Sequence, residues 1–431
     1  MNIIDGAKSS KRAQIILSAM DGKVKNNALK AIADELEKNK SLIFENNLRD
    51  LKDGEKNNLP APIIKRLKFD EEKLNFVISG IEQLIKLEEP TGKTLLATEL
   101  AQGLNLYRVS CPIGVIGVIF ESRPDALVQI AALCLKSGNG VILKGGSEAK
   151  YSNKVLFDII SATSAKAGIP QGWAVLAETR DDVAEMLKLS DYIDLIIPRG
   201  SNDFVKYIMN NTNIPVTGHS DGICHLFIDE TANIEKAMNI TLDSKTQYVS
   251  VCNALETLLV HEKAAERFLP KACEKLREKG VELRGDEKAR EIVSDMKDAV
   301  EKDWESEYLD YILSIKIVEN LDEAIEHINK YGSGHTDGIV SENAENVKKF
   351  MDLVDSSCVF HNCSTRFSDG YRFGFGAEVG VSTGKIHSRG PVGLDGLLIY
   401  KYKLFGNGDI VADFEEHKRK FTHKKKELKN V

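Results

Sequence analysis

The chain of 431 residues lacks two features that would point to nucleic acid or to membranes. It has no excess of basic residues: 65 acidic and 58 basic side chains give a formal net charge of −7, which does not favour a general nucleic-acid binder. Its apolar stretches, such as residues 115–120, are far too short to span a bilayer, and its first residues form no basic and then apolar leader. We therefore expect a cytoplasmic protein that binds neither nucleic acid nor membrane.

The seven cysteines include no Cys-x-x-Cys pair, and their number is odd. This pattern argues against a disulfide framework and against a structural zinc site. Cys358 and Cys363 lie five residues apart with only His361 nearby, which is a poor set of metal ligands. We therefore expect reduced thiols and no metal, which leaves room for one cysteine to act in catalysis.

Apolar residues are plentiful, at 42% of the chain, and the length suggests two or three domains. Residues 21–86 have a helical pattern, with an apolar stripe at Ala28, Leu29, Ile32 and Leu36. From residue 114 onward, short apolar runs alternate with amphipathic helices, which predicts an α/β fold with a parallel, doubly wound sheet. The expected strands are residues 114–120, 141–143, 174–176, 192–197 and 224–228, separated by helices at residues 126–136, 150–167, 182–187 and 202–211.

A second α/β stretch follows, with strands expected at residues 256–260 and 312–318. The glycine-rich residues 372–393 do not read as a regular element, whereas residues 397–405 read as a strand. We expect the basic residues 417–429 to form a frayed, solvated helix rather than a binding element.

One glycine-rich turn is placed to bind a nucleotide. Lys144, Gly145, Gly146 and Ser147 follow a buried strand and open a long helix, so they lie at the carboxyl edge of the sheet, where nucleotides bind. A plain strand-to-helix turn is the alternative. The glycines of residues 374–380 have the wrong spacing for a dinucleotide motif and no strand before them.

Cys252 precedes an apolar strand in a turn that could open onto a cleft. The alternative interpretation is a small buried apolar side chain, because a thiol becomes a working nucleophile only in an electropositive setting. The other cysteines are less suitable, because they lie at a strand entry (Cys111), on an apolar helix face (Cys134), or within a strand or helix (Cys224, Cys273).

Two arginines stand beside hydroxyl groups at expected strand ends. Ser364, Thr365 and Arg366 follow one strand, and Ser122 and Arg123 follow another. Guanidinium groups match the oxygens of phosphate and carboxylate, so both places suit an anionic ligand. For each arginine alone, a structural salt bridge is the alternative.

Long segments of the chain together resemble one family, the γ-glutamyl phosphate reductases (glutamate-5-semialdehyde dehydrogenases) of the aldehyde dehydrogenase superfamily. The resemblance runs in order over about residues 10–410. Its segments are CPIGVIGVIFESRPDALVQIA, GNGVILKGGSEA, LIIPRGSNDFV, IPVTGHSDGICHLFID, VCNALETLLVH and STRFSDGYRFGFGAEVGVSTGKIHSRGPVGL.

The resemblance implies an aldehyde-dehydrogenase-like fold with a Rossmann-like cofactor domain and a homodimer or homotetramer. The cofactor domain would be discontinuous, formed by residues 1–95 and 111–228, with a catalytic domain at residues 229–390. A small β element for oligomerisation would join residues 96–110 to residues 391–412, with pairing to the strand at residues 397–405. Residues 413–431 would form a basic tail.

The resemblance also implies site residues. Cys252 matches the nucleophile, and Asn253 or backbone N–H groups would stabilise an oxyanion. Cofactor residues would be Lys144 at the adenosine ribose and its phosphate, Gly145, Gly146 and Ser147 in the same turn, Gly200 and Ser201 at the pyrophosphate, and Glu307 at the nicotinamide ribose. The substrate's phosphate and carboxylate would be held by Ser122, Arg123, Ser364, Thr365 and Arg366.

The implied activity is NADPH-dependent reduction of L-γ-glutamyl 5-phosphate to L-glutamate 5-semialdehyde and phosphate through a cysteine thioester, the second step of proline biosynthesis from glutamate. No kinase segment precedes these motifs, so we expect coupling to a separate glutamate 5-kinase.

Alternatives are a hydrolytic aldehyde dehydrogenase of the same fold, a non-catalytic scaffold and, resting only on the basic tail, a nucleic-acid-binding module. Ordinary aldehyde dehydrogenases carry an asparagine in the turn at residues 120–124 and a glutamate base near Gly218 and His219. This chain has neither, which suits a thioester exchanged with phosphate rather than hydrolysed.

Overall fold

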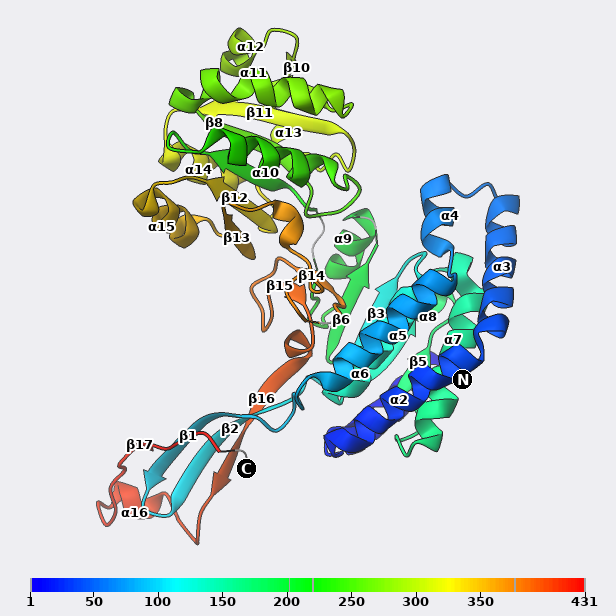
Figure 1. Cartoon of the computed structure of the whole chain (residues 1–431). Helices are drawn as coiled ribbons and strands as arrows, with labels where there is room; N and C mark the ends of the chain where they lie inside the picture. The colour runs from blue at the N-terminus through cyan, green and yellow to red at the C-terminus, as the bar shows by residue number, and fades with distance from the viewer. Residues whose placement is uncertain (1, 201, 219–220, 376, 430–431) are drawn as a thin grey trace.

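The computed structural model describes residues 2–200, 202–218, 221–375 and 377–429. Figure 1 shows three parts: an α/β lobe that contains the N-terminus, a second α/β lobe above it, and an extended sheet that projects to the lower left. The first lobe begins with five helices, which are α1 (Ile3–Leu17), α2 (Gly22–Lys38), α3 (Lys40–Lys56), α4 (Ala61–Leu67) and α5 (Glu71–Lys86). Asp21 caps α2 and Asp70 caps α5, since each side chain accepts a hydrogen bond from a backbone N–H of the first turn.

The first lobe contains a four-stranded parallel sheet in the order β5-β4-β3-β6. Its strands are β3 (Val115–Phe120), β4 (Gly140–Lys144), β5 (Ala174–Leu176) and β6 (Leu195–Arg199), connected by α6 (Pro124–Ser137), α7 (Lys150–Lys166) and α8 (Arg180–Met186) and followed by α9 (Asn202–Asn210). Every residue of β3 and β4 is buried, as the continuous apolar runs predict for a sheet covered on both faces.

Separate apolar clusters cover the two faces of this sheet. The predicted stripe on α2 packs with α5, α6 and α7 against one face, where Leu29 and Leu36 are fully buried. Helices α1, α8 and α9 cover the other face around Ile119 and Ile142. Fully burying a side chain of this size stabilises the fold by roughly 1.5–3 kcal/mol relative to exposure. The first sheet is therefore rigid enough to fix the turns at its carboxyl edge.

The second lobe holds a seven-stranded parallel sheet in the order β10-β9-β11-β8-β7-β12-β13. Its strands are β7 (Cys224–Ile228), β8 (Leu255–His261), β9 (Glu282–Gly285), β10 (Lys297–Asp298), β11 (Ile312–Val318), β12 (Thr336–Val340) and β13 (Cys358–His361). Its helices are α10 (Ile234–Thr246), α11 (Glu262–Glu278), α12 (Glu287–Ile292), α13 (Glu301–Trp304), α14 (Leu321–Tyr331) and α15 (Ala344–Leu353). Helices α10 and α11 cover one face and α14 and α15 the other.

The strand expected at residues 224–228 forms, but it joins this second sheet rather than the first. β7 pairs with β8 and β12, and the first sheet ends at β6. Hydrophobic periodicity identifies a buried strand but carries no information about its neighbours, so the grouping could not be derived from the pattern.

The extended sheet has the order β16-β2-β1-β17. It consists of β1 (Thr94–Ala101), β2 (Leu104–Pro112), β16 (Leu398–Phe405) and β17 (Lys424–Lys425), with α16 (Ala412–Glu415) before β17. The expected pairing of β2 with β16 is confirmed, because their antiparallel register runs from Pro112 and Leu398 to Asn105 and Phe405.

The prediction that the basic tail forms a frayed helix is wrong. Lys424 and Lys425 form β17, which pairs antiparallel with β1 and occupies the backbone groups of its otherwise open edge. The rings of Phe414 and Phe421 stack with centroids 4.2 Å apart, which holds the approach to β17.

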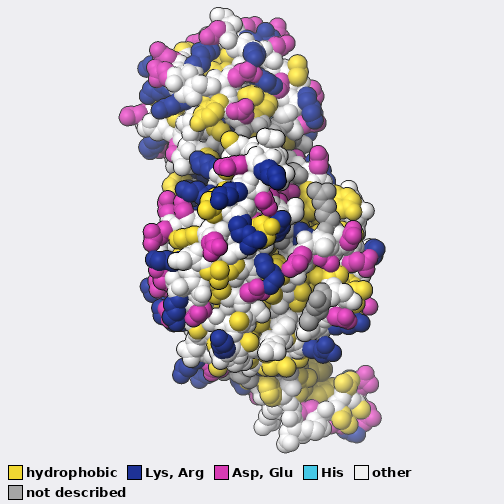
Figure 2. Space-filling model, turned by 90° about the vertical axis from the view of Figure 1, so that its right-hand side faces the viewer, with side chains coloured by type: hydrophobic (Ala, Val, Ile, Leu, Met, Phe, Trp, Pro, Cys, Tyr) yellow, Lys and Arg dark blue, Asp and Glu magenta, His cyan; other side chains and the backbone are white. Residues whose placement is uncertain are grey.

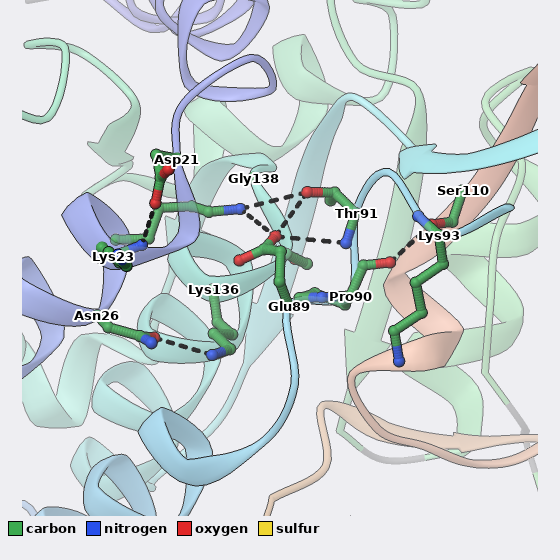
Figure 3. Close-up of polar contacts among 12 residues, drawn as sticks. Asp21, Lys23, Asn26, Glu89, Pro90, Thr91, Lys93, Ser110, Lys136 and Gly138 are labelled. Carbon is green, nitrogen blue, oxygen red and sulfur yellow. Dashed lines mark hydrogen bonds and ion pairs between the residues drawn. The ribbon is translucent and has the colours of Figure 1, made fainter. Parts of the chain in front are cut away.

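The segment between α5 and β1 is tied to the first lobe by two buried lysines. The ammonium of Lys25 lies 2.5 Å from Oε1 of Glu89, and Lys136 donates to Oδ1 of Asn26 and to the carbonyl of Leu87. Ser110, at the end of β2, donates to the carbonyl of Pro90 at 2.7 Å (Figure 3). Because a buried ammonium needs a counter-charge or hydrogen-bond acceptors, these contacts anchor the root of the extended sheet.

The glycine-rich residues 372–393 are mostly irregular, as expected, but contain two short antiparallel strands, β14 (Gly380–Ser382) and β15 (Gly390–Val392). Gly390 has a φ of 81°, a left-handed conformation that favours glycine, so the chain can turn sharply into β15. This segment lies beside the cleft between the lobes.

Candidate active site

The two parallel sheets face each other across a cleft of about 360 Å³. One sheet presents its carboxyl edge to this cleft and the other its amino edge. The carboxyl ends of β3 and β6 contribute Arg123, Arg199 and Gly200 to its lining. The loop before β8 contributes Cys252 and Asn253, so the second sheet presents its amino edge to the same space. In Figure 2, lysine and arginine side chains gather at the level where the upper lobe meets the rest of the molecule.

Cys252 is half-buried in the turn between α10 and β8. Gly222 packs directly against it, because a Cβ on this glycine would lie 2.1 Å from the carbonyl oxygen of Cys252 and 2.5 Å from its Cα. Any larger side chain would have to push the turn that carries the thiol. Among the described cysteines, Cys252 is the one that lines the cleft.

The sulfur of Cys252 has an imidazole partner. Nε2 of His335 lies 3.1 Å from Sγ of Cys252, and the His335 ring is fully buried at the amino end of β12. The opposite nitrogen, Nδ1, lies 2.8 Å from the hydroxyl of Thr336. His335 was not among the predicted residues. In the sequence, His335 follows two glycines and directly precedes a buried strand. This places it at the amino edge of the sheet, where no chemistry was expected.

The other thiols are unsuited to catalysis. Cys224 is fully buried, donates to the carbonyl of Cys252 at 3.2 Å, and has a pKa raised well above its ordinary value by burial. Burial likewise raises the pKa of Cys273 to about 12 and raises that of Cys134. These side chains behave as apolar core, as predicted.

Four arginines line the cleft around Cys252, which are Arg66, Arg123, Arg199 and Arg366. Arg199 was not predicted, although it ends a buried strand, as Lys144 does. Burial lowers the pKa of Arg199 and of Arg366, yet guanidinium groups keep their charge in proteins. Arg366 donates from Nε to Oε1 of Gln247 at 3.0 Å, which leaves its outer nitrogens for a ligand.

Three carboxylates balance part of this charge, one of them Asp369, which lines the cleft. Arg123 pairs with Asp125 at 2.9 Å, and Glu378 lines the cleft beside Arg199. Burial raises the pKa of Glu378, although Arg199 opposes that effect. The cleft therefore keeps a basic character that suits an anionic substrate.

Several predicted substrate residues lie outside the lining. Ser122 has a φ of 45°, and both its backbone N–H and its hydroxyl donate to Oε1 of Glu148, at 2.6 and 2.7 Å. Ser364 and Thr365 are buried against Ser244 of α10, where they hold the turn that presents Arg366.

The side chain of Asn253 is also not placed to stabilise an oxyanion. It donates from Nδ2 to the carbonyl of Ser368 at 2.8 Å and so ties the cysteine turn to the segment after β13. Among the described residues, nothing accepts a hydrogen bond from the backbone N–H of Cys252 or of Asn253. These two N–H groups are the better candidates to stabilise an oxyanion.

The predicted nucleotide turn lies at the carboxyl end of β4. Lys144 is buried and donates to the carbonyl of Gly145 at 2.6 Å. A Cβ on Gly145 would lie 2.1 Å from Nδ2 of Asn153, and one on Gly146 would lie 2.0 Å from Oε1 of Glu148. Side chains that follow in the chain therefore pack closely against both glycines, Gly145 is buried, and the exposed Ser147 follows them.

The second predicted cofactor turn follows β6 on the same edge. A Cβ on Gly200 would lie 3.0 Å from Phe204, so this turn is also narrow. Ser201 lies outside the described residues. Glu307, from the other lobe, accepts a hydrogen bond of 2.9 Å from Nδ2 of Asn202, the first residue of α9. Two glycine turns and a lysine along one sheet edge fit an elongated, phosphate-bearing dinucleotide.

A buried ion pair lies beneath the cysteine turn. Lys245 of α10 and Glu256 of β8 are fully buried, with 2.6 Å between Nζ and Oε2. Burial raises the pKa of Glu256 and lowers that of Lys245, because it disfavours both charges. The pair joins the elements on either side of residues 247–254, and no sequence pattern indicated it.

The described residues contain no cluster of three or more His, Cys, Asp or Glu side chains able to hold a metal. No helix in the same part of the chain combines the length and apolarity needed to cross a membrane.

Comparisons with known proteins agree with this site. The model of the aldehyde dehydrogenase family matches residues 2–291. A γ-glutamyl phosphate reductase of Pelotomaculum thermopropionicum is 59% identical over 425 residues, which cover 99% of this chain and 98% of that protein. The crystal structure of the γ-glutamyl phosphate reductase of Thermotoga maritima has a TM-score of 0.93 and 41% identity, covering 95% of this chain and 100% of that one.

A more distant structure, an engineered glycolyl-CoA reductase with bound NADP⁺, is 15% identical, with a TM-score of 0.62 and coverage of 93% and 96%. At that identity it shows the shared fold alone. The chain belongs to the aldehyde dehydrogenase family and, within it, to the γ-glutamyl phosphate reductases. It is accordingly an oxidoreductase with the aldehyde dehydrogenase fold, as the resemblance implied.

Proposed function

We propose that this protein reduces L-γ-glutamyl 5-phosphate to L-glutamate 5-semialdehyde and phosphate with NADPH, the second step of proline biosynthesis from glutamate. The observation that carries the proposal is the position of Cys252 within a cleft lined by four arginines. The substrate has an acyl carbon that a thiolate can attack, and anionic phosphate and carboxylate groups for guanidinium to bind.

The arginines divide between the two sides of the cleft. Arg123 and Arg199 belong to the carboxyl edge of the first sheet, and Arg366 follows β13 of the second. A substrate that is anionic at both ends can bridge these positions with its acyl carbon between them. We assign Arg366 to the phosphate, because Gln247 holds its Nε and leaves its outer nitrogens for a bidentate ligand, and Arg123 with Arg199 to the carboxylate.

The reaction begins when the Cys252 thiolate attacks the acyl carbon and phosphate departs, which leaves a thioester. The backbone N–H groups of Cys252 and Asn253 stabilise the negative charge on the acyl oxygen during attack. NADPH held at the carboxyl edge of the first sheet would supply the hydride that reduces the thioester. The resulting thiohemiacetal collapses to the aldehyde and frees Cys252 for another turnover.

Lys144, Gly145, Gly146 and Ser147 would hold the adenosine ribose and its phosphate, and Gly200 the pyrophosphate. The buried position of Lys144 beside a narrow glycine turn supports this placement, because a fixed ammonium favours the additional phosphate of NADPH over NADH. Glu307 would hold the nicotinamide ribose, with Asn202 keeping its carboxylate in place.

We also propose a cytoplasmic homo-oligomer that receives its substrate from a separate glutamate 5-kinase. Tyr400, Tyr402 and Leu404 of β16 are exposed, which supports assembly through the extended sheet.

The test is the reverse reaction. Glutamate semialdehyde is supplied with NADP⁺ and, in parallel, with NAD⁺, and formation of the reduced cofactor is followed with and without inorganic phosphate. The proposal requires phosphate to stimulate the reaction and NADP⁺ to be preferred. Oxidation at an equal rate without phosphate would contradict it and indicate a hydrolytic aldehyde dehydrogenase.

A further inference from the structure

We propose that His335 is the base that takes the thiol proton of Cys252 and then holds the thiolate in an ion pair. The inference rests on the function proposed above, in which Cys252 is the nucleophile. That function needs a group that ionises the thiol, because a free thiol is only a few per cent ionised near neutral pH.

The geometry favours proton transfer. Nε2 of His335 lies 3.1 Å from the reacting sulfur, which is hydrogen-bond distance for a thiol or thiolate. Nδ1 lies 2.8 Å from Oγ1 of Thr336, which can accept a hydrogen bond from Nδ1–H. That tautomer leaves the lone pair of Nε2 facing the thiol. Thr336 is thus a positioning residue, and His335 the catalytic one.

Burial gives the imidazole a fixed orientation. His335 is fully buried while Cys252 is half-buried, so the base is shielded and the nucleophile faces the cleft. Cys224 also lies near the ring, with its sulfur 3.8 Å from Nδ1. Because burial raises its pKa, Cys224 stays protonated and donates to the carbonyl of Cys252. It does not compete for the base.

The surrounding charges favour the ion pair. Arg199 and Arg366 both interact electrostatically with Cys252, so positive charge faces the sulfur from both sides of the cleft. Two carboxylates, those of Asp337 and Glu256, act on the neighbouring Cys224.

Both carboxylates are already paired. Asp337 lies 2.9 Å from Nδ1 of His225, and Glu256 lies 2.6 Å from Nζ of Lys245. Neither is therefore free to take the thiol proton.

The chemistry balances with a single base. The S–H proton moves to Nε2 first, and the thiolate then forms the S–C bond while the C–O bond to phosphate breaks with its electron pair on the phosphate oxygen. The departing phosphate takes from solvent the proton that the overall reduction consumes. When the reduced thiohemiacetal alkoxide collapses, the C–S bond breaks with its pair on sulfur, and the imidazolium returns the proton to the thiolate.

Alkylation of Cys252 tests the inference without substrate or cofactor. Iodoacetamide, a neutral reagent, is applied to wild type and to His335→Gln at pH 7 and pH 9.5, and modification of Cys252 is followed by mass spectrometry. We expect the variant to react at least about tenfold more slowly at pH 7 and within about twofold of wild type at pH 9.5, where an ordinary thiol ionises unaided. Thr336→Val should show a smaller loss at pH 7.

His327→Gln is the matched control, because His327 is buried in the same lobe without contact to Cys252. It should alkylate as wild type at both pH values. Equal rates at pH 7 for wild type and His335→Gln would overturn the proposal. So would an equal slowing of His335→Gln at both pH values, since that pattern indicates a displaced turn rather than a lost base.

Turnover separates this inference from the proposed function. If wild type fails to reduce γ-glutamyl phosphate while alkylation depends on His335, the proposed function is wrong and the role of His335 as the base still holds. If wild type turns over and His335→Gln keeps wild-type alkylation, only the inference fails. When both hold, kcat of His335→Gln should fall by about 10²–10⁴-fold with NADP⁺ affinity unchanged.

Discussion

The two parallel sheets bring opposite edges to one cleft, and each edge has its own chemistry. The carboxyl edge of the first sheet carries glycine turns, Lys144 and Arg199, which suit anions and a dinucleotide. The amino edge of the second sheet carries Cys252 and His335, which suit covalent chemistry. The rule that ligands bind at carboxyl edges of parallel sheets therefore locates only half of this site.

The edges also differ in how they are built. At the carboxyl edge, turns between a strand and the next helix place backbone groups near the ligand. At the amino edge, two loops from distant parts of the chain meet: Gly222 packs against the Cys252 turn, and a buried ion pair joins the elements on either side of that turn. We expect substitutions at the first edge to change binding and those at the second to change turnover.

The largest effect should follow Cys252→Ala. Removing the nucleophile should lower kcat by at least about 10⁴-fold, because no other group can form the thioester. NADP⁺ affinity, measured by calorimetry, should stay within about twofold of wild type, since Cys252 is not among the proposed cofactor contacts, most of which lie on the other edge. Cys111→Ala, a half-buried thiol in the extended sheet, is the control and should keep full activity. Loss of cofactor binding in Cys252→Ala would show that the edges are not independent.

Breaking the buried ion pair should have the next largest effect. Glu256→Gln leaves the Lys245 ammonium unpaired in the core, which should lower the free energy of unfolding by about 3–5 kcal/mol in urea titrations. The double variant Lys245→Met with Glu256→Leu should recover most of that loss. Asp158→Asn, which breaks the exposed pair with Lys154, should cost less than about 1 kcal/mol. A similarly small loss for Glu256→Gln would contradict the structural role assigned to the pair.

Gly222→Ala should impair turnover without unfolding the protein. The added Cβ overlaps the Cys252 backbone, and a displacement of about 1 Å at a reacting group can cost about 10²-fold in rate. Gly384→Ala is the matched control, because its Cβ would meet nothing closer than 3.9 Å. Steady-state kinetics should show lower kcat with unchanged NADP⁺ affinity. A change confined to cofactor binding would contradict the assignment of turnover to the amino edge of the second sheet.

The smallest effect should follow Lys144→Met. Losing the ammonium should weaken NADP⁺ binding by about tenfold, as expected for one charge-assisted contact, and should leave NAD⁺ binding within about twofold. Lys150→Met, an exposed lysine of the next helix that pairs with Asp53, should change neither affinity. Equal weakening of both cofactors would place Lys144 elsewhere than at the additional phosphate.

The sequence predicted most regular elements because buried strands and amphipathic helices leave clear patterns. The runs at β3, β4 and β8 are mostly apolar, and every residue of the three strands is buried in the structure. Sheet membership and the tail were predicted less well. The place of β7 and the pairing of β17 depend on contacts between segments far apart in the chain, which local patterns do not encode.

The site shows the same limit. The positions of Lys144 and Arg366 at the ends of expected strands predicted their binding roles. The role of Cys252 came from the family resemblance. His335 lies 83 residues from Cys252 in the chain. The two meet because β8 and β12 lie in one sheet with only β7 between them. Gly222 likewise acquires its role only when its loop meets the Cys252 turn, and the Lys245–Glu256 pair forms only when α10 packs against β8.

The strand order of the extended sheet has a consequence for folding during synthesis. β1 and β2 are made early, but β16, which covers the other edge of β2, comes near the end of the chain, and β17 later still. Until then the hairpin presents open backbone edges on the ribosome, the kind of surface that recruits other strands. Its anchorage by Lys25 and Lys136 ties those edges to an already folded lobe, so a truncated chain should aggregate through this hairpin while the lobe itself stays native.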